Sequence, residues 1–155
     1  MKKNVFIGLL VILMVFGLVG CEDGDNGGTG GISQDPNIIL NWTEKNLATT
    51  SSTETHAFAV TEGKTYYIFI KDYFHSSVAS SDTSWASISH TGRYADDSEA
   101  YARSGLGNGN TTPVNFISDR NGNVTITVDA AGVLGRAGNY KIAVTTENSR
   151  PSGDS

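Results

Sequence analysis

The sequence contains very little cysteine: one residue, Cys21, among 155. No intrachain disulfide can form, so the fold depends on apolar burial and hydrogen bonds alone. Basic residues are also scarce, with 11 lysines and arginines against 16 acidic residues. Binding to nucleic acid needs clustered basic side chains, so this balance predicts no nucleic-acid partner.

The sequence also lacks the usual signatures of catalysis. It contains no nucleophile elbow of the G-x-S-x-G kind. Its three histidines, His56, His75 and His90, are too widely spaced for an H-x-x-x-H zinc motif, and no cysteine accompanies them. We therefore predict a protein that is not an enzyme and holds no transition metal.

One long apolar run is present, close to the start of the chain. It extends from Val5 to Gly20 behind the basic pair Lys2-Lys3. As a helix at about 1.5 Å per residue it would span roughly 24 Å, short of the roughly 30 Å hydrocarbon core of a membrane. The run therefore favours a secretory signal peptide over an uncleaved transmembrane anchor.

The end of this run, Leu18-Val19-Gly20-Cys21, resembles the lipobox of bacterial lipoproteins. The resemblance implies that residues 1–20 are removed, that Cys21 carries a diacylglycerol thioether, and that its new amino group is acylated. Membrane lipid is then a partner through Cys21. The expected location is the bacterial cell envelope, with the outer membrane or cell surface favoured over the inner membrane.

Residues 21–36 predict a lipidated cysteine followed by a flexible tether. The stretch from Glu22 to Gln34 is acidic, rich in glycine and almost free of apolar side chains. Such a segment has little to bury and a high ordering cost. A flexible chain of this length reaches about 20 Å, enough to lift a domain off the lipid headgroups.

Residues 37–148 show short alternating runs separated by turn residues, which predicts an antiparallel β-sandwich of six to eight strands. The clearest pattern is a hairpin, with strands at 56–61 and 65–71 around Glu62-Gly63-Lys64. Asn121-Gly122 predicts a second hairpin turn. We expect further strands near 85–90, 114–117, 124–128 and 140–144, a weak one around Tyr94 to Tyr101, and a disordered tail at 149–155.

The alternation also predicts which side chains face inward. Thirteen apolar side chains share the inward faces of these strands: Phe58, Val60, Tyr66, Ile68, Ile70, Ile88, Phe116, Val124, Ile126, Val128, Tyr140, Ile142 and Val144. Each fully buried aliphatic or phenylalanine side chain contributes roughly 1.5–3 kcal/mol before conformational entropy is counted. That is enough for a core without disulfides.

Two of these runs resemble a known family. The segment from Ala57 to Ile68 is similar to the opening run of bacterial pre-peptidase C-terminal (PPC-like) domains, and Gly138 to Val144 resembles their G-x-Y-x-I-x-V ending. The resemblance implies a jelly-roll-like β-sandwich that accompanies secreted enzymes or surface proteins. Some members of that family bind calcium, carbohydrate or matrix proteins.

Two acidic or amide-rich segments are candidate calcium sites, because calcium takes six to eight oxygen ligands. Asp119, Asn121 and Asn123 form a D-x-N-G-N pattern, although Asn121-Gly122 is also explained as a turn. The second segment contains Asp96, Asp97 and Glu99, which a solvated loop also explains. Calcium is the only cofactor that the sequence suggests.

Aromatic side chains offer a candidate ligand surface. Trp85, Tyr94 and Tyr101 could stack on sugar rings, or they could pack against the core. Together these observations predict a lipid-anchored, non-catalytic binding module for a glycan, a matrix protein or an envelope partner. The alternatives are a structural or envelope-assembly lipoprotein without a soluble ligand, and an accessory module to a secreted hydrolase.

Overall fold

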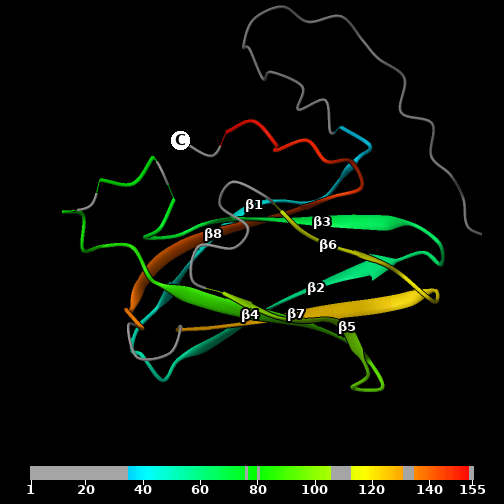
Figure 1. Cartoon of the computed structure of the whole chain (residues 1–155), viewed down its shortest axis with the longest axis horizontal. Coiled ribbons are helices and arrows are strands. Elements are labelled where there is room, and N and C mark those ends of the chain that lie inside the picture. Colours follow the sequence, from blue (N-terminus) through cyan, green and yellow to red (C-terminus); the bar gives the residue numbers. More distant parts are fainter. Residues whose placement is uncertain (1–34, 76, 80, 106–112, 131–134, 154–155) are drawn as a thin grey trace, which may run out of the picture. The chain divides into compact units, whose positions relative to one another are not determined.

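The computed structural model describes residues 35–75, 77–79, 81–105, 113–130 and 135–153. The predicted signal peptide, Cys21 and nearly all of the tether lie outside these residues. The described residues form eight β-strands and no helix (Figure 1). In chain order the strands are β1 (Ile38–Leu47), β2 (Thr53–Val60), β3 (Thr65–Lys71), β4 (Ile88–Tyr94), β5 (Glu99–Gly105), β6 (Val114–Ile117), β7 (Gly122–Ala130) and β8 (Gly138–Thr145).

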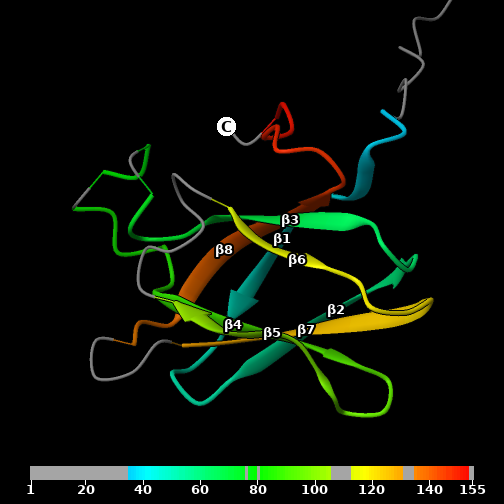
Figure 2. The same ribbon diagram turned by 45° about the vertical axis from the view of Figure 1, so that its right-hand side comes forward.

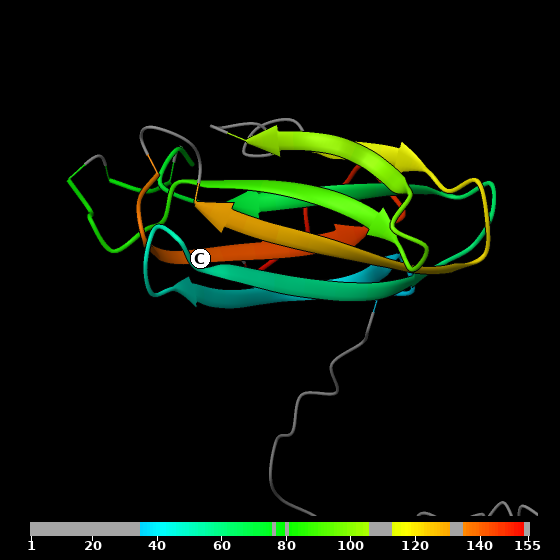
Figure 3. The ribbon, with the colours of Figure 1, turned by 90° about the horizontal axis from the view of Figure 1, so that it is seen from below.

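The strands build two antiparallel four-stranded sheets that pack face to face (Figures 1 and 2). Sheet A has the order β1-β8-β3-β6, and sheet B has the order β2-β7-β4-β5, which Figure 3 views face on. The chain changes sheet at nearly every connection, which is the strand order of a jelly roll. The predicted fold class, an antiparallel jelly-roll-like sandwich, is therefore confirmed.

The two hairpins predicted from the sequence are wrong as pairings, although their strands and turns exist. β2 pairs with β7 and β3 pairs with β8 and β6, so the turn at Gly63 carries the chain from sheet B to sheet A. The Gly63 N–H donates to the Ser118 carbonyl at 2.8 Å instead of closing a hairpin. Asn121-Gly122 likewise connects β6 in sheet A to β7 in sheet B. Alternation reveals which face is buried, but it does not name the neighbouring strand.

The hairpin that does form joins β4 to β5, inside the stretch that gave the weakest sequence signal. The Tyr94 N–H donates to the Ser98 carbonyl at 2.9 Å, and Asp97 adopts a left-handed φ of 65°. The Asp96 carboxylate accepts hydrogen bonds from the backbone N–H and hydroxyl of Ser98. Aspartate tolerates both roles, so the turn needs neither glycine nor asparagine.

β1 is a strand that the alternation did not predict. It lies at the edge of sheet A, and its register with β8 shifts between Ile38 and Leu40 and again between Leu40 and Thr43. Each shift interrupts the two-residue period, because an irregular residue exchanges the inner and outer faces. Only Leu47 at its end is fully buried.

The core confirms the predicted inward set. All thirteen side chains are at most 7% exposed, and Leu47, Ala86, Tyr94 and Tyr101 join them. The Tyr66 and Phe116 rings stack at 5.4 Å between centroids, and the Tyr101 ring stacks on Phe116 at 5.7 Å. Aromatic stacking of this kind adds to the energy of burial.

The predicted disordered tail needs a correction as far as Gly153. Pro151 is buried, and its carbonyl accepts a hydrogen bond from the Trp42 indole N–H at 3.0 Å. The tail has few apolar residues, so its composition alone indicates disorder. In the structure, contacts of Arg150 and Pro151 hold it against sheet A. Residues 154 and 155 lie outside the described residues.

The sandwich has two ends that differ in their connections. The described chain enters beside the last residues of β8, where Ile38 pairs with Thr145. The β2–β3, β4–β5 and β6–β7 connections lie at this same end, which we call the entry end (Figure 1). The opposite end, here the loop end, carries the long connection 72–87 between β3 and β4.

Candidate functional site

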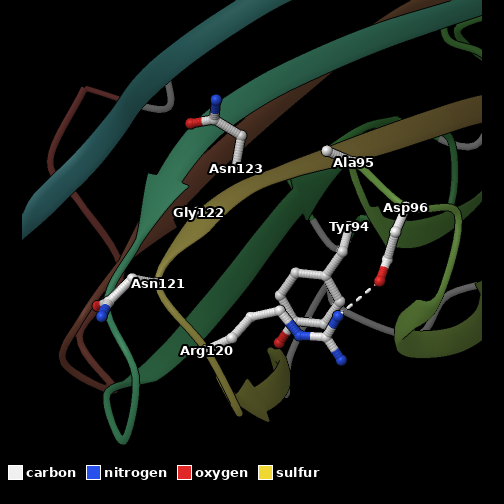
Figure 4. A pocket seen from close by; sticks show the side chains of 7 residues that line it. All are labelled: Tyr94, Ala95, Asp96, Arg120, Asn121, Gly122 and Asn123. Carbon is white, nitrogen blue, oxygen red and sulfur yellow. Dashed lines mark hydrogen bonds and ion pairs between the residues drawn. The ribbon is translucent and has the colours of Figure 1, made fainter.

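The two predicted calcium segments meet at the entry end. Asp96 lies in the β4–β5 turn, Asp119 lies between β6 and β7, and Arg120 binds both. Figure 4 shows the contact between Arg120 and Asp96. Arg120 Nη1 donates to Asp96 at 2.7 Å, while Nε and Nη2 donate to the two Asp119 oxygens at 2.8 and 3.0 Å. The guanidinium carbon also lies 4.5 Å from the Tyr94 ring centroid. The Arg120 guanidinium therefore lies between two carboxylates that the sequence offers as candidate calcium ligands.

This arrangement keeps the carboxylates ionised. The hydrogen bond from Arg120 is the largest cause that lowers the pKa of Asp119. The pKa of Asp96 is lowered first by the Ser98 hydroxyl and backbone N–H, and less by Arg120. Hydrogen bonds to a charged form favour that form. Both carboxylates are thus acceptors already in use.

The remaining predicted calcium residues have separate surroundings. Asn121 accepts a hydrogen bond from the Glu62 N–H at 3.1 Å, which fixes the β2–β3 turn. Asn123 is exposed and, with Asn121, lines a pocket of about 210 Å³ beside Arg120 (Figure 4). Asp97 forms an ion pair with Arg93 at 3.6 Å, and Glu99 is exposed at the start of β5.

Among the described residues, no group of three histidine, cysteine, aspartate or glutamate side chains is arranged to hold a metal ion. Calcium at Asp96, Asp97, Glu99, Asp119, Asn121 and Asn123 stays a prediction. Calcium binding at Asp96 and Asp119 would depend on Arg120, because a cation would have to compete with the guanidinium for the same carboxylate oxygens.

The aromatic residues predicted to form a stacking surface do not lie together. Tyr94 and Tyr101 are each 7% exposed and belong to the core. The Tyr94 hydroxyl lies 3.2 Å from Ser118 Oγ, and the Tyr101 ring packs over Gly92. Burial leaves the Tyr101 ring no open face for a sugar. The Tyr94 ring borders the pocket beside Arg120, but the Arg120 guanidinium lies over it. The strands of both tyrosines carry weak alternation, so the sequence did not show that these tyrosines point inward.

Trp85 lies at the loop end and is half-buried. Its backbone forms a bridge with Asn139, the Ala86 N–H donates to the Asn139 carbonyl at 2.7 Å, and the Lys71 ammonium lies 5.3 Å from the Trp85 ring centroid. Gly138 permits this close approach, because a Cβ there would lie 2.9 Å from the Trp85 carbonyl carbon.

Three further residues that the sequence analysis did not select surround this position. The Tyr73 N–H donates to the Ala86 carbonyl at 2.8 Å, and the Arg136 guanidinium lies 4.1 Å from the Tyr73 ring centroid. Phe74 packs edge-on against Tyr73 and is 41% exposed. We call Lys71, Tyr73, Phe74, Trp85 and Arg136 the loop-end cluster. Two adjacent aromatic residues directly after a predicted strand were the signal that could have found it.

The histidines take part in structural contacts. His56 Nε2 and the Tyr140 hydroxyl lie 2.8 Å apart in the core, and His90 Nδ1 lies 2.8 Å from the Tyr101 hydroxyl. His75 Nδ1 lies 2.7 Å from Ser77 Oγ in the β3–β4 connection. Burial lowers the pKa of His56 and lowers that of His90 to about 4. Both buried imidazoles are therefore neutral at pH 7.

Comparison with models of protein families and with curated protein sequences finds no match to this chain. The lipoprotein and PPC-like resemblances therefore stay predictions. The described residues include no helix of the length and apolar character that a membrane span requires.

Proposed function

We propose that this protein is a lipid-anchored binding module of the bacterial cell envelope, and that it contacts a glycan, matrix protein or envelope partner through the loop-end cluster. The observation that carries the proposal is the position of this cluster. It lies at the end of the sandwich opposite the point where the described chain enters. A tether on the N-terminal side attaches at the entry end, and the loop end with its cluster is free of that attachment.

The loop-end cluster has the chemistry of a recognition surface. Its connection of 16 residues, 72–87, is long for a compact domain, and such loops commonly carry function. Phe74 exposes a large apolar side chain, and the partly exposed Arg136 places a cation on the Tyr73 ring. Lys71 is buried, and its ammonium lies against the Trp85 ring from within the domain. Aromatic and arginine side chains are the ones that most often dominate binding energy.

A binding experiment on whole cells tests the surface. Cells displaying the full chain are offered panels of glycans and matrix proteins, and retained ligand is measured. We expect Phe74→Ala to reduce binding about tenfold or more, as truncation of a central aromatic contact does. Ile117→Ala is the matched control, because Ile117 is 66% exposed at the entry end and should bind normally. Equal loss in both variants, or no loss in either, contradicts the proposed surface.

A second experiment tests the anchor separately. Cys21→Ala should leave an unprocessed chain that incorporates no labelled fatty acid and is missing from the lipid-modified fraction. Continued labelling of this variant would refute lipidation at Cys21. The binding panel compares variants that both keep Cys21, so its outcome and that of the Cys21→Ala experiment are interpreted separately.

A further inference from the structure

The tail strap, residues 146–153, contacts sheet A through Arg150 and Pro151, and its first residue, Thr146, donates its N–H to the Asn37 carbonyl at 2.8 Å. The Arg150 guanidinium lies 4.7 Å from the Trp42 ring centroid and 5.9 Å from that of Phe69, and Nη2 donates to the Ile70 carbonyl at 3.2 Å. The carbonyl of Pro151 accepts the Trp42 indole N–H at 3.0 Å. A short exposed arm, residues 147–149, precedes this contact, and Ser152 after it is exposed again.

The surface beneath the strap is formed by two large rings and a small residue between them, and we call it the Trp42–Phe69 slot. Trp42 comes from β1 and Phe69 from β3, and β8 runs between them. Ala143 of β8 pairs directly with Phe69 and is fully buried, so a methyl group forms the floor between two large rings. A guanidinium over the rings and a carbonyl on the indole N–H satisfy the apolar and polar parts of the slot together.

The strap is not sealed against the domain. A pocket of about 250 Å³ remains between it and the strand ends, lined by residues that include Asp35, Ile38, Glu147 and Ser149. A segment that only completed the core would be buried along most of its residues. In this strap Pro151 is buried and Arg150 is partly buried, while residues 147–149 and Ser152 are exposed. This footprint is that of a peptide ligand: an anchor of two residues with exposed flanks.

We propose that the Trp42–Phe69 slot is a peptide-recognition site for an arginine followed by a proline, and that the strap occupies it in cis. The partner is an extended segment of another protein with that pair of residues, because aromatic-lined grooves bind extended proline-containing peptides. The strap then acts as an internal competitor. The inference goes beyond the loop-end surface and does not depend on it.

The test uses the full chain with its strap released by Arg150→Ala and Pro151→Gly. A fluorescent peptide with the sequence of residues 147–153 is titrated, and anisotropy is measured. Docking in cis at an effective concentration of about 1 mM is populated only if the peptide binds more tightly than that. We therefore expect saturable binding with half-saturation below about 1 mM. The unchanged chain should bind roughly tenfold more weakly, because its own strap competes.

Three controls decide the interpretation. A peptide with alanine in place of Arg150 should not bind the released chain. Trp42→Phe, which keeps a ring but removes the indole donor, should weaken binding in that chain. Arg136→Ala removes the cation stacked on Tyr73 at the other end and should not create peptide binding. A released chain that loses cooperative unfolding, or that folds without binding the peptide, overturns the proposal, since the strap is then part of the fold.

Discussion

The entry end and the loop end of the same sandwich are stabilised in different ways. At the entry end the core is aromatic, with Phe58, Tyr66 and Phe116 in contact, and Arg120 neutralises the surface carboxylates. Toward the loop end the core contains the neutral imidazoles of His56 and His90. The difference predicts that mutation and acid affect the loop end first.

The largest effect should come from the close backbone contact at the loop end. Gly138 has a φ of 138°, and a Cβ there would overlap the Ser84 carbonyl oxygen. Backbone strain of about 1–3 kcal/mol and overpacking of about 1–3 kcal/mol would add, so Gly138→Ala should lower the free energy of unfolding by about 2–6 kcal/mol. Urea unfolding measures this loss.

Gly63 is the matched control for that substitution at the entry end. It also has a positive φ, 78°, but a Cβ there would contact nothing within 4 Å. Gly63→Ala should therefore lose only the left-handed backbone term, about 1–2 kcal/mol. If the two variants lose equal free energy of unfolding, the close contact of Gly138 with the 84–86 backbone does not add to the cost, and the inference of tight packing at the loop end is contradicted.

The second effect concerns acid. Burial lowers the pKa of His90 from 6.5 to about 4, opposed by Asp129 of β7. Burial is also the first cause for His56, with Lys45 of β1 adding and Glu54 opposing. Between pH 6.5 and 4 these histidines are therefore protonated in the unfolded chain but remain more neutral in the folded chain. For His90 alone the stabilisation is complete above pH 6.5, and about 3 kcal/mol is lost by pH 4.

Hydrogen exchange and urea unfolding across this pH range locate the acid response. Amides of β4 and β8 next to the histidines should lose protection before those around Phe58 and Tyr66. His90→Phe leaves Tyr101 without its partner and is less stable at pH 7, but its unfolding free energy should depend less on pH. If the free energy of unfolding of this variant depends on pH as steeply as that of the unchanged protein, His90 is not the cause of the acid response.

The smallest effect tests the entry end. Because Arg120 already binds Asp96 and Asp119, millimolar calcium should not raise the melting temperature of the unchanged protein. Arg120→Gln removes the guanidinium from both carboxylates, although Ser98 still binds Asp96, and should create a small rise with calcium that a chelator reverses. Arg93→Gln, which removes the neighbouring exposed arginine, is the control. A rise in the unchanged protein would show that calcium displaces the guanidinium.

The sequence predicted the strands better than their pairing. β6 was expected at 114–117 and forms there, and the inward faces of β3, β7 and β8 are as the alternation indicated. β1 was missed because its register shifts break the period. For the candidate sites, the sequence analysis selected Trp85 without Tyr73 and Phe74, since no local pattern links Trp85 to residues eleven and twelve positions earlier in the same connection.

The sequence by itself determined the sandwich, because apolar alternation is a local property that fixes which face of each strand is buried. The resemblance of Leu18-Val19-Gly20-Cys21 to a lipobox is also a property of the sequence, and lipidation of Cys21 stays a prediction. Only the tertiary structure decided that β2 and β3 lie in opposite sheets, that Arg120 joins Asp96 to Asp119, and that Arg150 lies on Trp42. These contacts join residues far apart in the chain, and their energies depend on the whole fold rather than on neighbouring sequence.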